Sequence, residues 1–280
     1  MADADPPRRG FDVLSDETRL GIVRALADRL RETPEDPTVG FADLRRQVGV
    51  SDSGNFNYHL ERLDGRFVRK TADGYRIAPA GIMVVAALIT GVYGESSQLG
   101  PTELDDTCPA CGEVFTATYE ESVLRVTCPN EHTFQHALPP GVIDDRTLAD
   151  LIELLTLKTR HDLQLALEGV CPFCYAQLAW SFDAEVRTEM PKVETRCSRC
   201  GVHFTVPIIM SVVHHPIVAS FYHDHGIDVR KRPLWAPEFF DGVDVTVPDS
   251  DQVRVTIERG DGTVTVTLDQ SLSVVEVVRK

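Results

Sequence analysis

Hydrophobic and polar positions repeat along the chain with two different periods, and the change of period divides the sequence into segments. Residues 14–30 place leucine, isoleucine and valine at helical spacing behind a Ser/Asp cap. Shorter helices are predicted at 41–50 and 51–65, separated by a tight turn at Gly49. Residues 67–77 then predict two short strands around a turn. The first third of the chain is therefore expected to be helical with one hairpin.

The helix predicted at 51–65 has two different faces. Phe56, Leu60 and Leu63 lie on one face, which we expect to pack in a core. Small and polar side chains lie on the opposite face. The order helix, short helix, tight turn, helix, hairpin is that of a winged helix-turn-helix.

The remainder of the chain changes to short alternating strands and closely spaced cysteines. Residues 253–268 alternate with a period of two and predict a hairpin with Asp261-Gly262 at its turn. The predicted fold class is α+β multidomain, with these segments: a disordered N-terminus (1–10), a winged helix-turn-helix (11–94), a polar linker (95–106), a first zinc ribbon (107–143), a connecting helix (144–169), a second zinc ribbon (170–207), and a helical stretch with a β-hairpin tail (208–280).

Composition narrows the class of protein. The longest apolar run, Ile82–Ile89, is far below the ~20 residues that cross a bilayer, so we expect no membrane association. The polar N-terminus does not resemble a signal peptide, and paired cysteines without export favour metal binding, so a cytoplasmic protein is expected. The net charge of −15 argues against nucleic acid as a partner. However, lysine is scarce and aspartate abundant, a bias typical of salt-accumulating halophiles, whose surfaces are acidic whatever they bind.

The charge is uneven, and the first segment is the part suited to a polyanion. Residues 1–94 hold 13 basic and 14 acidic side chains, whereas residues 95–280 hold 15 and 29. Asparagine can pair with adenine edges, while serine, tyrosine and arginine reach phosphates. The candidate DNA-binding residues are Ser51, Ser53, Gly54, Asn55, Asn57, Tyr58, Arg62, Arg66, Arg69, Lys70 and Arg76. The alternatives are solvated surface groups, or a winged helix that binds protein.

Residues 11–94 resemble a known family. The run LSDETRLGIVRAL, followed by VGVSDSGNFNYHLERL and a GY-containing wing, is similar to ArsR-type winged-helix transcription regulators of the halophilic archaeal kind. The resemblance implies binding of double-stranded DNA by a symmetric dimer, with the third helix in the major groove. The segment has no cysteine, so the Cys-based sensor site of metal-sensing members is absent, and His59 is expected to be structural or on the surface. The apolar segment 79–94 predicts a dimer seam or a helix buried in its own domain.

The second cysteine unit has the spacing of a zinc ribbon. Two Cys-x-x-Cys turns are separated by 22 residues that include alternating apolar segments suited to two strands. Zinc takes four tetrahedral ligands from thiolate sulfur or imidazole nitrogen. The predicted ligands are Cys171, Cys174, Cys197 and Cys200.

The first cysteine unit has only three cysteines, Cys108, Cys111 and Cys128. His132 follows Cys128 with three residues between them and would complete a Cys3His site. His136 is too distant for one turn, and Glu131 is a poorer partner for a thiolate-rich site. Seven cysteines and one histidine then make eight ligands for two Zn²⁺ ions per chain. Both sites would be full, which indicates structural zinc; release of metal on oxidation is an alternative role.

Residues 214–228 hold a histidine cluster, with Asp224 beside His214, His215, His223 and His225. These spacings do not fall on one helix face. We expect surface and capping histidines around a core of Ile217, Val218, Phe221 and Tyr222, with a divalent-metal sensor or a metalloenzyme site as the alternative.

The sequence thus predicts a cytoplasmic, DNA-binding transcription regulator that is not an enzyme. A homodimer is expected to read an operator, with two structural zinc sites in a regulatory or assembly region and a small molecule or a protein as effector. The alternative is a zinc-ribbon adaptor that docks on the transcription machinery and does not itself select a DNA sequence.

Overall fold

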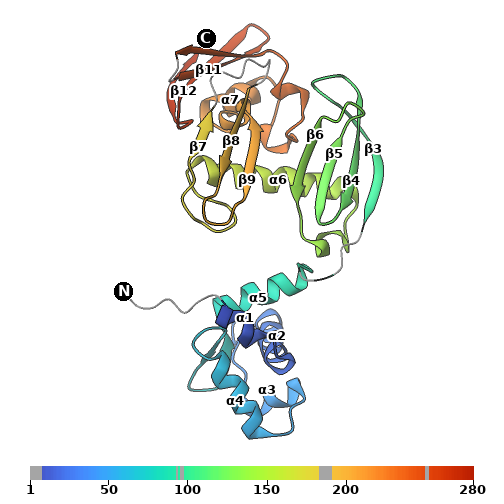
Figure 1. Ribbon diagram of the computed structural model, residues 1–280, viewed down its shortest axis with the longest axis vertical. Coiled ribbons are helices and arrows are strands. Elements are labelled where there is room, and N and C mark those ends of the chain that lie inside the picture. The colour runs from blue at the N-terminus through green and yellow to red at the C-terminus, as the bar shows by residue number, and fades with distance from the viewer. Residues whose placement is uncertain (1–7, 93, 95–97, 183–190, 250–251) are drawn as a thin grey trace. The chain divides into compact units, whose positions relative to one another are not determined.

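The computed structural model of the chain describes residues 8–92, 94, 98–182, 191–249 and 252–280 (Figure 1). Two compact units are present, Met1–Glu95 and Ser96–Lys280. The fold is mixed α and β, and the described part contains seven α-helices and four antiparallel sheets. The described part of the first unit has one hydrophobic core, and that of the second unit has two.

The first unit follows the predicted order of elements, with one helix added at its start. Its elements are α1 (Arg8–Leu14), α2 (Glu17–Glu32), α3 (Phe41–Val48), α4 (Ser53–Leu63), the hairpin β1 (Val68–Lys70) and β2 (Tyr75–Ile77), and α5 (Pro79–Ile89). Helix α1 begins inside the segment expected to be disordered to residue 10, of which residues 1–7 lie outside the described part.

Local chemistry explains where these helices begin and end. The Asp16 side chain accepts a hydrogen bond from the backbone N–H of Arg19, and Asp52 accepts one from Asn55, so both act as N-caps. Gly49 ends α3 in the left-handed conformation that glycine adopts without strain. Phe56, Leu60 and Leu63 of α4 are buried, which confirms the predicted core face. They pack with Ile22, Val23, Leu26 and Leu44.

The second unit begins earlier than predicted. Residues 99–106, expected to be linker, form most of strand β3 (Leu99–Thr107), which pairs with β4 (Val114–Glu120). Strands β5 (Val123–Thr127) and β6 (Thr133–Ala137) complete a four-stranded antiparallel sheet. Strand β3 lies at the edge and is mostly exposed, so it shows no alternation of apolar residues. Pairing with β4 rather than local pattern therefore makes it a strand.

Helix α6 (Leu148–Leu167) connects the first sheet to the second and contributes to both hydrophobic cores of the unit (Figure 1). A capping box formed by Thr147 and Asp150 starts it. Leu151 and Leu155 pack on the first sheet, whereas Leu163 and Ala166 pack with the second. The second sheet consists of β7 (Trp180–Phe182), β8 (Lys192–Arg196) and β9 (His203–Pro207).

The C-terminal part is an integral layer of the second unit rather than an appended tail. It contains α7 (Pro216–Asp224) and a four-stranded sheet of β10 (Val243–Asp249), β11 (Gln252–Arg259), β12 (Gly262–Asp269) and β13 (Val274–Arg279). The predicted hairpin is confirmed, with its turn shifted by one residue to Gly260-Asp261. Val255, Ile257, Val264 and Val266 pack in the same core as Leu163, so the sheet and α6 depend on each other.

Candidate metal centres and the α4 surface

The first metal cluster is formed where the β3–β4 turn meets the β5–β6 turn. His132 Nδ1 lies 3.4 Å from Cys108 Sγ and 3.5 Å from Cys128 Sγ, and Cys111 Sγ lies 3.6 Å from Cys128 Sγ. All four ligand atoms lie within 4.8 Å of one another. His132, which the sequence selected as the fourth ligand, is thus the histidine that the fold brings to the three cysteines.

The second metal cluster has the same arrangement with four sulfurs. Cys171 Sγ lies 3.7 Å from Cys200 Sγ, and Cys174 Sγ lies 3.5 Å from Cys197 Sγ. Four thiolates held tetrahedrally at about 2.3 Å from one ion lie roughly 3.8 Å apart. The separations in both clusters are close to this value, and neither cluster forms a disulfide. Each donor set therefore fits one tetrahedral metal ion.

Three of the four ligand-bearing turns share one backbone pattern. The first cysteine N–H donates to the carbonyl five residues later, at Glu113, Ala176 and Val202, with N···O distances of 2.8 Å in each case. The residue after the second cysteine is left-handed: Gly112, Tyr175 and Gly201 have φ of 75°, 57° and 79°. Tyr175 is unusual because a side chain at positive φ costs conformational energy that glycine does not pay.

The turn from Cys128 to His132 departs from this pattern in a way that explains its spacing. Its left-handed residue is Glu131, with φ of 63°, which precedes the fourth ligand instead of following it. The Cys128 N–H accordingly donates to the carbonyl four residues later, at His132, with a distance of 3.2 Å. The aromatic residue after the ligand, Phe134, therefore arrives two positions on, where it packs against Phe115.

Backbone amides prepare one cysteine of each cluster for metal. The N–H of Glu113 is the main cause that lowers the pKa of Cys111 to about 6. The N–H of Cys200 acts in the same way on Cys197 and lowers its pKa to about 6. The thiolate is the form that binds metal, and these hydrogen bonds stabilise the thiolate of Cys111 and of Cys197.

His136, the alternative fourth ligand, is held by a different partner. Its Nε2 lies 3.1 Å from Asp162 Oδ2 of α6, which also accepts a hydrogen bond of 2.7 Å from Lys158 Nζ. Burial by itself raises the pKa of Asp162, but the hydrogen bonds from His136 and Lys158 outweigh it and hold the pKa below its usual range. This network joins β6 to α6, and its members have a structural role.

Replacement of His132 by alanine should lower the metal content from two ions per chain towards one. The corresponding change at His136 should leave two ions bound, because His136 contacts Asp162 and not the cysteines. Elemental analysis of the purified variants measures both values. Two ions in the His132→Ala protein would show that this site needs only its cysteines.

The histidines at 214–225 do not converge on one point. His215 Nδ1 accepts from the backbone N–H of Ile217 at the start of α7, and His225 Nδ1 lies 2.8 Å from the carbonyl of Phe221. Burial lowers the pKa of His214 to about 4. Among the described residues, groups of three or more metal-ligating side chains occur at the two cysteine clusters and not here. Of the expected core residues, Val218, Phe221 and Tyr222 are buried, but Ile217 is exposed.

The α4 surface is defined here as the exposed side chains of α4, of the turn before it, and of the β1–β2 hairpin. All eleven candidate DNA-binding residues from Ser51 to Arg76 are exposed. Asn57 Nδ2 donates to Glu61 Oε1 at 2.7 Å, and the Arg62 guanidinium lies 5.3 Å from the Tyr58 ring centroid. The turn before α4 is braced by Arg45, which donates to the carbonyls of Val50 and Ser51.

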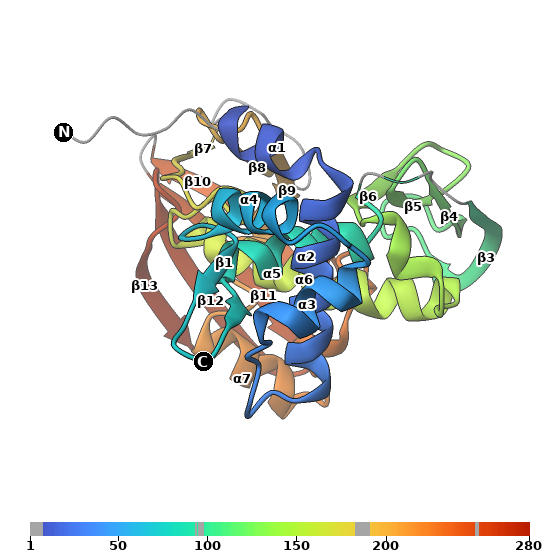
Figure 2. The ribbon, with the colours of Figure 1, turned by 90° about the horizontal axis from the view of Figure 1, so that it is seen from below.

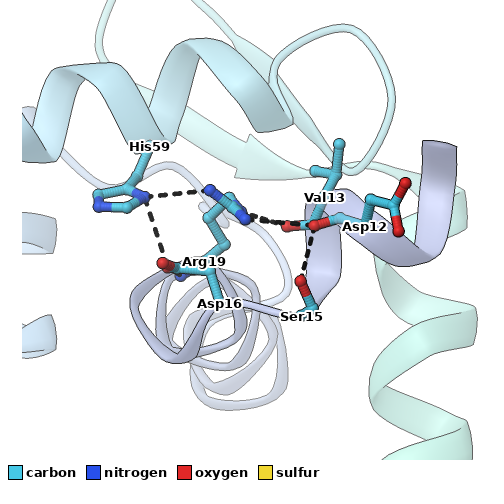
Figure 3. A network of polar contacts seen from close by, with 6 residues as sticks. All are labelled: Asp12, Val13, Ser15, Asp16, Arg19 and His59. Atoms are coloured by element: carbon cyan, nitrogen blue, oxygen red, sulfur yellow. Dashed lines mark hydrogen bonds and ion pairs between the residues drawn. The ribbon is translucent and has the colours of Figure 1, made fainter.

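A polar network on the buried side connects α4 to α2 and, through Arg19, to the end of α1 (Figure 3). His59 Nδ1 lies 3.4 Å from Asp16 Oδ1 and 3.5 Å from an Arg19 guanidinium nitrogen. The same Arg19 donates to the carbonyls of Val13 and Asp12 at the end of α1. His59 therefore has the structural role expected of it. Sequence reasoning did not find Asp16 and Arg19 as its partners, because they lie about 40 residues away with no local signal.

No described helix combines the length and apolar character needed to span a bilayer.

Residues 7–88 match a family model described as domain of unknown function (DUF7347). A search of curated proteins gives no match. Residues 105–274, which include both metal clusters, α6 and most of the C-terminal sheet, match a second model. The chain therefore belongs to the family described as domain of unknown function (DUF7351).

Proposed function

We propose that the protein is a DNA-binding transcription regulator whose first unit is a winged helix-turn-helix. The observation that carries the proposal is the α4 surface. A helix packed through Phe56, Leu60 and Leu63 presents serine, asparagine, tyrosine and arginine to solvent. Side chains of this kind at the start of an exposed helix suit the major groove, where amides pair with adenine edges.

The β1–β2 hairpin would act as the wing. Arg69, Lys70 and Arg76 are exposed on it, and Arg66 lies just before it. These cations would contact phosphates or the minor groove on either side of the α4 helix. In concentrated salt the release of counterions contributes little, so base contacts and DNA shape would supply most of the specificity.

A homodimer formed through α5 is part of this proposal. Gly81 and Val85 of α5 are buried in the first unit, but Ile82, Met83 and Ile89 are exposed. An apolar face without charged residues gains stability when a second copy covers it. A two-fold dimer would place two α4 helices on successive major grooves and would select a palindromic operator.

The two clusters would hold structural zinc. The ligands are Cys108, Cys111, Cys128 and His132 in one site, and Cys171, Cys174, Cys197 and Cys200 in the other. Zinc would supply cross-links between turns of small sheets. Four protein ligands leave no position for water, so no catalytic role is proposed.

Selection of DNA from a random pool tests the regulator. The full chain and the fragment 1–94, both in high-potassium buffer, should enrich the same palindromic sequence, with the fragment binding more weakly. Enrichment by neither protein would refute sequence-specific binding. A third outcome is that only the full chain enriches a sequence and that substitutions in α4 do not change its binding to that sequence. This outcome would place DNA recognition outside the first unit.

A second candidate function, an adaptor that docks on other proteins, is favoured by one observation. Phe173 and Tyr175 in the turn of the second metal cluster are 48% and 71% exposed, and Tyr175 is held at positive φ. Exposed aromatic side chains on a rigid turn are typical of binding hot spots. Under this alternative, Tyr175→Gly would abolish partner capture while α4 substitutions had no effect.

A further inference from the structure

The two edges of the C-terminal sheet differ in how they are protected. In the order β10-β11-β12-β13, strands β10 and β13 form the edges. Strand β10 carries Asp244 and Pro248, and its register with β11 is irregular between Thr246 and Asp249. Charges, prolines and irregularities of this kind prevent an edge strand from pairing with another chain. β10 is therefore a protected edge.

Strand β13 contains no proline, and its two charged residues, Glu276 and Arg279, have opposite signs. Its sequence is VVEVVR, and its exposed residues include Val274, Val275 and Val278. Figure 2 shows β13 as the outermost strand, beside β12. Its irregularity against β12 lies near Val274, so the stretch from Glu276 onward is regular. A regular, valine-rich, exposed edge is the kind that accepts a further strand.

The backbone groups of β13 that face outward can be identified from its bonds to β12. Lys280 and Thr263 exchange both backbone hydrogen bonds, at 2.9 and 3.1 Å. Antiparallel strands alternate bonded and non-bonded residues, so Val278 and Glu276 also turn their N–H and C=O groups towards β12. The N–H and C=O groups of Val277 and Arg279 therefore point away from it. In the described part of the chain, no strand lies on that side.

We propose that β13 pairs antiparallel with β13 of a second copy of the chain, about a two-fold axis at Val278. Directly opposed residues of antiparallel strands have side chains on the same face, so only alternate registers are allowed. An axis at Val278 places Val277 opposite Arg279 of the second copy, and these residues exchange their outward hydrogen bonds. It also places Glu276 of each copy opposite Lys280 of the other copy, which makes two such pairs.

Charge complementarity selects both this occupant and this register. Two copies that each carry a net charge of −15 repel each other, so a contact between them needs a surface with balanced charge. The register with the axis at Val278 gives two opposite-charge pairs, one on each side of the pair of valines. An axis at Val277 gives none, and an axis at Glu276 opposes two carboxylates. The result is one continuous sheet of the strands of both copies, and it does not depend on DNA binding by the first unit.

Zero-length cross-linking tests the register. A carbodiimide joins a carboxylate to an amine in direct contact, with loss of water that the reagent takes up. Within one strand, Glu276 and Lys280 are about 13 Å apart, too far for this bond. With a mixture of ¹⁴N- and ¹⁵N-labelled full chains carrying metal, mass spectrometry should find mixed-label peptides that join Glu276 to Lys280. Cross-links from β13 to residues 1–94, or none between copies, would overturn the proposal.

A matched pair of substitutions tests the contribution to affinity. Val278 on β13 and Val247 on β10 are both 38% exposed. In full chains that also carry Met83→Glu, which removes any contribution of α5, Val278→Lys should weaken dimerisation at least 10-fold in sedimentation equilibrium. Val247→Lys should change it less than 2-fold. Pairing at β13 would be refuted if the two lysine substitutions weakened dimerisation equally, or if the Met83→Glu chain were already monomeric without them. Neither result would affect the proposal that the α4 surface binds DNA.

Discussion

Removal of both metal ions from the full chain should unfold residues 96–280 and leave the first unit folded. A structural zinc contributes about 10–16 kcal/mol of apparent binding free energy in small zinc domains, as much as the ~5–15 kcal/mol that stabilises a whole domain. Both clusters lie in the second unit, and α6 joins their sheets through shared cores. The binding free energy that is lost with the metal ions is therefore expected to exceed the free energy by which the remaining contacts stabilise the second unit.

Tryptophan fluorescence measures this result for the second unit alone. The chain has two tryptophans, Trp180 and Trp235, and both are buried in the second unit. Addition of a strong chelator should shift their emission to the red, while the circular dichroism of the helices in fragment 1–94 should not change. Re-addition of zinc should reverse the shift. Unchanged emission after complete removal of metal would mean that the clusters are not structural.

Simultaneous replacement of Asn55, Asn57 and Tyr58 by alanine should lower operator affinity at least 100-fold. Each good contact to a base edge contributes about 1–3 kcal/mol of discrimination, and two or three such contacts account for this factor. The three side chains are exposed, so folding free energy should change by no more than about 0.5 kcal/mol each. Fluorescence anisotropy with labelled operator measures the affinity, and thermal unfolding measures the stability.

Two arginine substitutions accompany that experiment, one in the α4 surface and one outside it as a control. Arg69→Ala on the hairpin should weaken binding equally for all sequences and reduce the salt dependence by about one unit of slope. Arg31→Ala at the end of α2 removes the same charge from an exposed position outside the α4 surface and should have little effect. If the triple variant binds its operator as the parent does, recognition through α4 is wrong.

The local pattern of apolar and polar residues was sufficient to predict the elements whose buried apolar residues lie on one face of the element. Helix α4, helix α6 and the β11–β12 hairpin were predicted because buried positions recur with the period of the element. The two groups of side chains that could each hold a metal ion were predicted because spacing in a tight turn determines which side chains can meet at one point.

The features that were missed depend on pairing between distant segments. Strand β3 contains Gly100, Pro101 and two aspartates, and it is a strand because β4 supplies a partner. His136 and Asp162 are 26 residues apart, and no sequence period connects a strand residue to the middle of a helix. The helical start at Arg8 was likewise missed, and the end of α1 is held by Arg19, which donates to the carbonyls of Val13 and Asp12.

Trp235 connects the first metal sheet to a late part of the chain. Its ring packs on Phe115 and Phe134, and its Nε1–H donates to Asp106 Oδ2 at 3.1 Å. During synthesis the cysteines and strands of this sheet leave the ribosome about a hundred residues before that tryptophan. At roughly 5–20 residues per second, the nascent sheet waits about 5–20 seconds for the side chain that completes its core. Metal capture by Cys108, Cys111, Cys128 and His132 would hold the growing chain together during that interval.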